Sequence, residues 1–202
     1  MTKAWLEKRK RDYYYQKAKK EKYRSRAAYK LLQAASKYKF IRKGDIVVDL
    51  GSAPGGWLQA SRKLVGAKGF VLGVDLKPID PLPEENVQTL IGDITDKKLA
   101  KKIMELLPRK ADVVLCDASP NISGVWEVDH ARQIDLATHA LRLAERILKR
   151  KGNFFVKVFQ GDMLNDYIKE MKRLFYTVRL IKPQASRAES SEIFLLGIEL
   201  NG

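Results

Sequence analysis

The chain has 202 residues, and its 39 Lys and Arg residues against 24 Asp and Glu residues give a net charge of +15. One cysteine cannot form an intramolecular disulfide, and with only two histidines it makes a poor zinc set, so we expect no metal site. No apolar run approaches the ~20 residues of a membrane span, and the first residues lack the apolar core of a signal peptide, which indicates a cytoplasmic protein without a membrane partner.

Positive charge is concentrated at the start of the chain. Residues 1–30 hold twelve Lys or Arg residues and three acidic ones. Four tyrosines are interleaved with these charges: Tyr13, Tyr14, Tyr15 and Tyr23. Because lysines neutralise phosphates and tyrosines stack on bases, the pattern favours nucleic-acid binding over a solvated tail. We therefore expect residues 1–24 to form a basic extension that binds RNA, and we see no sign of an obligate protein partner.

Helix and strand patterns alternate after this extension. A helix with an apolar stripe is expected over 25–38, with Ser25 as its N-cap. The expected strands cover 45–51, 69–76, 87–93, 111–117 and the apolar run around Lys157, and the expected helices cover 55–65, 97–107, 128–149 and 163–175. The last helix is expected to follow the strand of Lys157, and the helix before that strand to stop at Gly152.

This alternation predicts an α/β fold, with a mostly parallel sheet and helices on both of its faces. Two final strands are expected at 177–183 and 191–200. The loop between them is too short for a crossover helix, so they should pair antiparallel. Without repeats or an internal linker, residues 25–202 are expected to form one domain.

The loop after the first strand, in the stretch DLGSAPGGW, is where sheets of this kind bind ligands. Gly51 allows a tight turn, and Gly55 and Gly56 allow a ligand to approach the next helix. The spacing differs from the G-x-G-x-x-G fingerprint, which disfavours an NAD-dependent oxidoreductase. Trp57, directly after the glycines, either packs in the core or covers the ligand pocket.

Carboxylates end three successive strands of the predicted sheet. Asp75 can accept hydrogen bonds from both hydroxyls of a ribose, and Asp93 can meet an adenine amino group. Together with Asp49 they suit a ligand that carries hydroxyls and a cationic centre, and they would repel a phosphate. The set predicts S-adenosyl-L-methionine as the cofactor.

Lys157 lies in the run FFVKVF, residues 154–159. A continuous apolar run of this length is typical of a strand that is covered on both faces. A side chain that reaches outward to water is the alternative, but buried lysines without a partner are rare. We expect Lys157 to be catalytic, with partners supplied by other parts of the chain.

Four motifs in this order, DLGSAPGGW, DASPNISG, FFVKVFQGD and KPQASRAESSE, resemble the FtsJ/RrmJ (RlmE) family of ribose 2′-O-methyltransferases. The resemblance runs from about Ser25 to Leu200. It implies a Rossmann-like S-adenosyl-L-methionine-dependent methyltransferase fold with seven strands and an antiparallel C-terminal strand. It also implies methylation of RNA, in the first place of a uridine in 23S-type large-subunit ribosomal RNA. Ala185 and Phe194 stand where close relatives often have Ser and Tyr.

By the same resemblance, a catalytic tetrad maps onto Lys30, Asp117, Lys157 and Glu192. Lys157 would face the ribose 2′-hydroxyl, either as a neutral general base or as a charged group that stabilises the developing alkoxide. Asp117 would orient Lys157 and lie close to the cofactor. Lys30 would hold the substrate backbone or tune Lys157, and Glu192 would fix the second lysine or the ribose.

Two other readings of the function stay open at this stage. A methyltransferase of the same chemistry could act on the tRNA anticodon loop. A non-catalytic RNA-binding protein, such as a ribosome assembly factor, could keep the fold without the activity. The unsubstituted tetrad and the unbroken glycine loop speak against the second of these.

Overall fold

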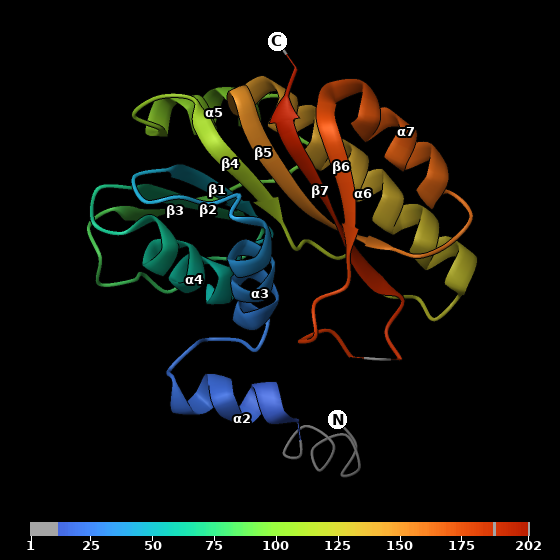
Figure 1. Cartoon of the computed structure of the whole chain (residues 1–202), viewed down its shortest axis with the longest axis horizontal. Coiled ribbons are helices and arrows are strands. Elements are labelled where there is room, and N and C mark those ends of the chain that lie inside the picture. Colours follow the sequence, from blue (N-terminus) through green and yellow to red (C-terminus); the bar gives the residue numbers. More distant parts are fainter. Residues whose placement is uncertain (1–11, 188, 202) are drawn as a thin grey trace.

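The computed structural model describes residues 12–187 and 189–201. In this part of the chain the strands are β1 (Ile46–Leu50), β2 (Phe70–Asp75), β3 (Val87–Ile91), β4 (Ala111–Cys116), β5 (Leu148–Phe159), β6 (Phe175–Ile181) and β7 (Glu192–Leu200). They form one sheet in the order β3-β2-β1-β4-β5-β7-β6. Only β7 runs antiparallel to its neighbours, so the mostly parallel sheet with an antiparallel C-terminal strand is confirmed (Figure 1).

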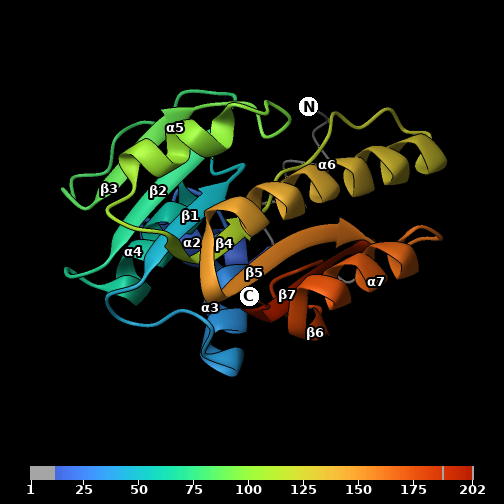
Figure 2. The ribbon, with the colours of Figure 1, turned by 90° about the horizontal axis from the view of Figure 1, so that it is seen from above.

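Helices cover both faces of the sheet (Figure 2). One face is packed by α3 (Ala28–Tyr38) and α4 (Gly56–Val65), and the other by α5 (Leu99–Leu106), α6 (Trp126–Ile147) and α7 (Leu164–Leu174). Each face has its own apolar core, and every residue of β1 and β4 is buried between them. Two-sided burial is the reason why these strands are apolar in the sequence apart from one aspartate each, Asp49 and Asp112.

The order in which successive strands are added to the sheet reverses at β1, near the middle of the sheet. From β1 the chain proceeds through β2 to β3 at one edge, and it then returns to β4 on the other side of β1. The carboxyl ends of β1 and β4 therefore lie side by side, with Leu50 paired to Cys116. Adjacent strands whose following connections diverge leave a crevice at this point, where ligands of such sheets bind.

Part of the predicted basic extension is folded. Its first eleven residues lie outside the described part of the chain, but Tyr13–Lys20 form helix α2, for which no helix was predicted. The Asp12 side chain caps α2 by accepting a hydrogen bond from the main-chain N–H of Tyr15 (3.1 Å). The segment then turns so that Tyr23 meets Tyr29 of α3, with ring centroids 5.5 Å apart. Residues 12–24 thus pack on the domain that they precede.

Several predicted boundaries differ from the structure; β6, for example, covers Phe175–Ile181 and not 177–183. Two of the differences have a clear local cause. Ser25 does not cap α3, which begins at Ala28 after Ala27, because the Ser25 side chain faces Gly56 instead. Helix α6 ends at Ile147 and not at Lys149, because Leu148 is already extended and pairs with Ala111 at the start of β5. The positive φ of Lys151 (60°) accompanies the shift in register that follows.

The amino-terminal edge of the sheet is tied together by Asp112. This buried carboxylate accepts a hydrogen bond from the Ile46 main-chain N–H (2.7 Å) and forms ion pairs with Arg109 (2.7 Å) and Lys149 (2.5 Å). Burial alone would raise the pKa of Asp112, but these three donors hold it below its ordinary value. Asp112 therefore joins the starts of β1, β4 and β5 at the edge opposite the crevice.

Candidate active site

Lys157 does not point to bulk water. It lies near the end of β5, only 6% exposed, and pairs with Phe194 of β7 in the register of the sheet. Its Nζ donates a hydrogen bond to the main-chain oxygen of Asp117 (2.8 Å) and lies 3.2 Å from Asp117 Oδ1. The second contact is an ion pair without hydrogen-bond geometry, since Oδ1 has no hydrogen-bond partner in the described structure. The lysine is therefore clamped to the end of β4.

Asp117 is held in turn by the first strand. It directly follows β4, and its main-chain N–H donates to the carbonyl oxygen of Leu50 (3.2 Å). Its side chain is 17% exposed, so one side of the carboxylate is open while the other meets Lys157. Because β1 and β4 are neighbours in the sheet, this residue stands at the crevice between their carboxyl ends.

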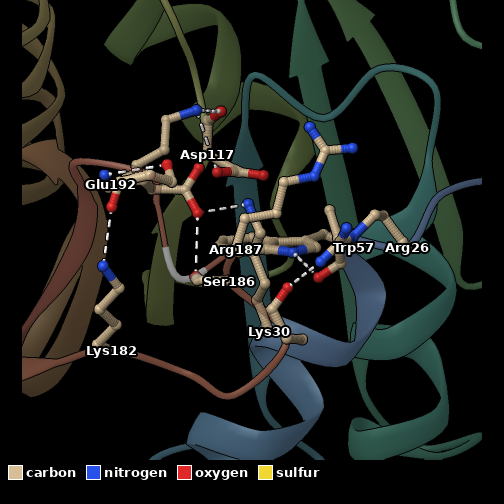
Figure 3. A network of polar contacts seen from close by, with 12 residues as sticks. Arg26, Lys30, Trp57, Asp117, Lys182, Ser186, Arg187 and Glu192 are labelled. Carbon is tan, nitrogen blue, oxygen red and sulfur yellow. Dashed lines mark hydrogen bonds and ion pairs between the residues drawn. The ribbon is translucent and has the colours of Figure 1, made fainter. Parts of the chain in front are cut away.

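A second lysine–carboxylate pair comes from two other elements (Figure 3). Lys30 on α3 reaches Glu192 at the start of β7, with 2.6 Å between Nζ and Oε1 and both side chains 13% exposed. Ser186 donates a hydrogen bond to the same oxygen of Glu192 (3.2 Å). A buried ion pair of this kind keeps its geometry only where further hydrogen bonds satisfy the carboxylate.

Phe194 connects the two pairs. It is the register partner of Lys157 across the β5–β7 pairing, and the Nζ of Lys30 lies 5.6 Å from the centre of its ring. Residues that alternate along a strand share a face, so Glu192 and Phe194 face the same side, toward α3. The structure thus brings the four residues predicted as the tetrad to one corner of the sheet.

A cavity of about 600 Å³ opens at the carboxyl ends of β1 to β4. Gly51, Asp75, Asp93 and Asp117, which are cofactor-binding candidates from the sequence, are in its lining. Asp75 accepts hydrogen bonds from the main-chain N–H groups of Ala53 and Lys77, both at 2.9 Å. These bonds fix the carboxylate, whose two oxygens have further lone pairs with which to accept from a ligand.

Gly51 is required by the shape of this cavity. Its φ is +74°, and an added Cβ would lie 2.6 Å from the Cα of Ala118. Only glycine allows the loops after β1 and β4 to approach so closely. The contact brings Gly51 beside Asp117 at the crevice.

Gly55, Gly56 and Trp57, predicted to contact the cofactor, are not in the lining of this cavity. A Cβ on Gly55 would meet the Arg24 side chain (2.8 Å), and one on Gly56 would meet Ser25 Oγ (2.1 Å). Trp57 is buried, stacks on Phe155 and donates from Nε1 to the carbonyl oxygen of Ala27 (2.7 Å). The three residues instead hold the segment before α3 against the start of α4.

Asp49 lies beneath the cavity and is fully buried. Neither of its carboxylate oxygens has a hydrogen-bond partner among the described residues. Burial, and after it the negative charges of Asp117 and Asp75, raise the pKa of Asp49 well above its ordinary value. The ligand-facing role expected for Asp49 is not supported by this position, because the cavity is lined by residues above it.

Sequence patterns did not point to the arginines beside the tetrad. Arg26 forms an ion pair with Asp12 and donates to the carbonyl oxygen of Ala185, and Arg187 lies 3.7 Å from the same Asp12 carboxylate. With Lys19 and Arg24 they line a basic recess of about 540 Å³. The two arginines come from segments far apart in the chain, so only the fold shows that they form one surface.

Comparison with known proteins agrees with this geometry. Residues 23–200 match the family model of the FtsJ-like methyltransferases. The chain belongs to this family. A protein of Methanococcus maripaludis named ribosomal RNA large subunit methyltransferase E is 52% identical over 200 residues, which cover 99% of this chain and 78% of the relative. A Methanosarcina mazei protein of the same name is 57% identical over 188 residues, 93% of this chain and 69% of the relative.

Solved structures of other methyltransferases share the fold of this FtsJ-like chain. A Plasmodium falciparum protein described as a ribosomal RNA methyltransferase has a TM-score of 0.79 at 30% identity, covering 89% of this chain and all of that one. Fibrillarin of Aeropyrum pernix, solved with bound S-adenosyl-L-methionine, has a TM-score of 0.60 at 16% identity, covering 87% and 75%. The fold predicted from the sequence is confirmed as that of S-adenosyl-L-methionine-dependent methyltransferases.

The cavity of this FtsJ-like methyltransferase fits that cofactor. Its volume lies in the usual range for small-molecule sites. Four carboxylates, those of Asp75, Asp93, Asp117 and Asp135, line it against the cations Lys77 and Arg132. An acidic lining suits a ligand that carries a positive centre and hydroxyl groups.

Proposed function

We propose that this protein methylates a ribose 2′-hydroxyl in large-subunit ribosomal RNA. The observation that carries the proposal is the position of Lys157. Its ammonium group is clamped to Asp117, which also lines the acidic cavity, while the basic recess lies on the side of Glu192. The names of the relatives support ribosomal RNA of the large subunit as the substrate, and we expect the protein to act in the cytoplasm.

Bound S-adenosyl-L-methionine would supply an activated methyl group, held by Gly51, Asp75, Asp93 and Asp117. The remaining work of the protein is to position the ribose and to manage one proton. Lys157 would face the 2′-oxygen, either taking its proton or stabilising the negative charge that develops on it. Asp117 keeps the lysine at the lip of the cavity by the contacts already described.

Lys30 and Glu192 serve as positioning residues in this proposal. Their ion pair is anchored by Ser186 and lies over Phe194, one strand away from Lys157. A hydroxyl of the target ribose can reach the Glu192 carboxylate, and a phosphate can reach Lys30. The neighbouring recess, with Arg24, Arg26 and Arg187, has the charge to bind the RNA backbone.

Incubation with labelled S-adenosyl-L-methionine and undermodified large ribosomal subunits tests the proposal. We expect one labelled nucleotide, mapped by resistance of the adjoining phosphodiester bond to alkaline cleavage, which only a 2′-O-methyl group confers. Label on a base, or label on tRNA in place of ribosomal RNA, would contradict it. A pH–rate profile then separates the roles of Lys157: a basic limb near neutral pH supports a general base, and a flat profile supports a charged stabiliser.

A further inference from the structure

A second concave surface lies beside the tetrad, on the α3 side of the sheet. It is a groove of about 750 Å³ between α2, α3 and the end of β6. We call it the tyrosine groove. Its lining contains the aromatic residues Tyr13, Tyr14, Tyr23, Tyr29 and Tyr38, the cations Lys17, Lys37, Lys63 and Lys182, and the acid Glu21. Figure 1 shows α2 and the loop between β6 and β7 at the same end of the molecule.

The inner tyrosines build the wall of the groove. Tyr29 is buried and donates to Glu21 (2.8 Å), while Tyr14 accepts from Gln33 (2.8 Å) and lies 5.5 Å from the Tyr29 ring. These contacts hold α2 on α3. Tyr13 differs, because it is 67% exposed and meets Tyr14 only edge-on, with ring centroids 5.2 Å apart at 78°. The faces of its ring can receive another flat group.

The charge of the tyrosine groove selects a polyanion. Four lysines line it against one glutamate. Lys17 and Lys37 stand over the rings of Tyr29 and Tyr38, at 5.0 and 5.4 Å from the ring centres. Lysines next to exposed aromatic rings are the combination with which proteins bind single-stranded nucleic acid, since the cations meet phosphates and the rings stack on bases. An acidic peptide would use the cations but not the open ring.

The wall of the tyrosine groove that β6 and α3 form lies within one nucleotide's reach of Lys157. Ile181, in its lining, is the register partner of Phe194, which is the partner of Lys157. Two strand spacings, about 10 Å, separate Ile181 from Lys157. On α3, Lys37 follows Lys30 by two turns, again about 10 Å along the axis. The target ribose cannot occupy both places, so the groove is placed for a neighbouring nucleotide.

We propose that the tyrosine groove binds an unpaired nucleotide that flanks the methylated one, with its base against Tyr13 and its phosphate near Lys37. This inference rests on the proposed function and sharpens the substrate class to a single-stranded segment of RNA. A base paired in a duplex has its face covered by its neighbours and cannot stack on a side chain, whereas a base in a loop can. The enzyme would therefore require unpaired nucleotides beside its target.

Tyr13→Leu tests the stacking contact, because leucine is apolar but has no ring. Tyr176→Leu is the matched control: Tyr176 is 68% exposed, but it stands at the start of β6, at the other end of this strand from the groove, and is not in the lining of the groove. With a synthetic RNA loop carrying the mapped target nucleotide, we expect Tyr13→Leu to weaken RNA binding about 5- to 50-fold. Tyr13→Phe and Tyr176→Leu should stay within twofold of the unchanged protein, and cofactor affinity should not change.

Abasic nucleotides identify the partner of Tyr13. The same RNA loop is made with one abasic position at a time, on either side of the target. At one position, removal of the base should weaken RNA binding by the unchanged protein as much as Tyr13→Leu weakens binding of the intact RNA. Combining the variant with the abasic RNA should then weaken binding little more than either change alone. Additive losses at every position, or an effect of Tyr13→Leu no larger than that of Tyr176→Leu, would overturn the proposal.

A separate readout concerns the lysines. Lys37→Gln should reduce the dependence of log affinity on log salt concentration by about 0.7, the share of one phosphate on a single strand. Lys101→Gln, on α5 with its side chain 84% exposed, is the control that should leave the slope unchanged. Equal slopes for both variants would contradict a phosphate contact at Lys37. Methyl transfer at a 2′-oxygen by the unchanged protein would persist in that case, so failure of the groove is distinguishable from failure of the proposed function.

Discussion

Two buried aspartates of the same sheet have opposite surroundings. Asp112, at the starting edge of β4, receives hydrogen bonds from Arg109, Lys149 and the main chain of Ile46. Asp49, near the end of β1, has no hydrogen-bond partner in the described structure. The pKa of Asp112 is lowered, and burial raises that of Asp49. At the starts of the parallel strands the buried charge is thus neutralised, which favours stability. Near their carboxyl ends, where ligands bind, a buried polar group stays without a partner.

The largest expected effect is at the ligand-binding edge. Lys157→Ala should lower methyl transfer by about 10³-fold or more, because the group that faces the 2′-oxygen is lost. Affinity for S-adenosyl-L-methionine should stay nearly unchanged, since Lys157 is not in the lining of the cavity. Single-turnover rates and calorimetry measure the two quantities. A variant that keeps the turnover of the unchanged protein would refute the role of Lys157.

Asp112→Ala tests the other edge. It leaves Arg109 and Lys149 without their carboxylate and removes the acceptor of the Ile46 N–H, so the free energy of unfolding should fall by about 3 kcal/mol. Denaturant unfolding measures this loss. Since the pKa of Asp112 is lowered in the folded state, its stabilisation is present above the unfolded value of ~3.9 and is lost as the pH falls through the folded value. The rate of methyl transfer at 25 °C should not change, and a large loss of rate would show that the two edges are coupled.

Breaking the Lys30–Glu192 pair should have an intermediate effect on activity. Lys30→Met and Glu192→Gln should each lower kcat/KM about tenfold, by misplacing the ribose or the backbone of the RNA. If the two residues act as a pair, the double variant should lose little more than either single one. Fully additive losses would mean that each residue contacts the substrate independently. Ser186→Ala should lower kcat/KM by less than either of these variants, because Ser186 only supports Glu192.

Asp49→Asn should give the smallest effect, and of opposite sign to Asp112→Ala. A raised pKa means that Asp49 is least destabilising below the unfolded value of ~3.9 and costs stability as the pH rises toward the folded value. The amide cannot ionise, so the variant should be more stable than the unchanged protein at pH 7. The difference should vanish near pH 3. Thermal unfolding at both pH values measures it, and equal stability at pH 7 would show that Asp49 has polar partners in solution.

The sheet was predictable because strands that are buried on both faces consist mainly of apolar residues. Strands such as β1 and β4 are apolar runs with a single aspartate each, Asp49 and Asp112, and the short loop before β7 dictated its antiparallel pairing. Helix α2 was missed because its face toward α3 consists of tyrosines and an alanine, which the charges around them obscured. Pairing of Asp112 with Ile46, Arg109 and Lys149 could not be anticipated, since it depends on which strand starts are neighbours.

The site was predictable in part. Asp75, Asp93 and Asp117 follow strands and so had to lie at one edge, where the structure places them around a cavity. Gly55, Gly56 and Trp57 lie outside the lining of the cavity, and their position has a physical cause: a small residue permits close approach, but the sequence does not say by what. Here the approaching group is the segment around Arg24 and Ser25. Arg187 carried no signal, because a loop residue has no periodicity to set its direction.

The reversed direction of β7 has a consequence for how such enzymes can diversify. The parallel strands have their last residues at the side of the sheet where the cavity opens, but β7 has its first residue, Glu192, at that side. The described residues of the connection that feeds it, 182–187 and 189–191, therefore lie on the side of Glu192, where the proposed RNA substrate would bind, and not at the far rim of the sheet. Exchanging this segment between relatives should redirect the enzyme to another RNA while Lys157 and Asp117, fixed by other strands, continue the same chemistry.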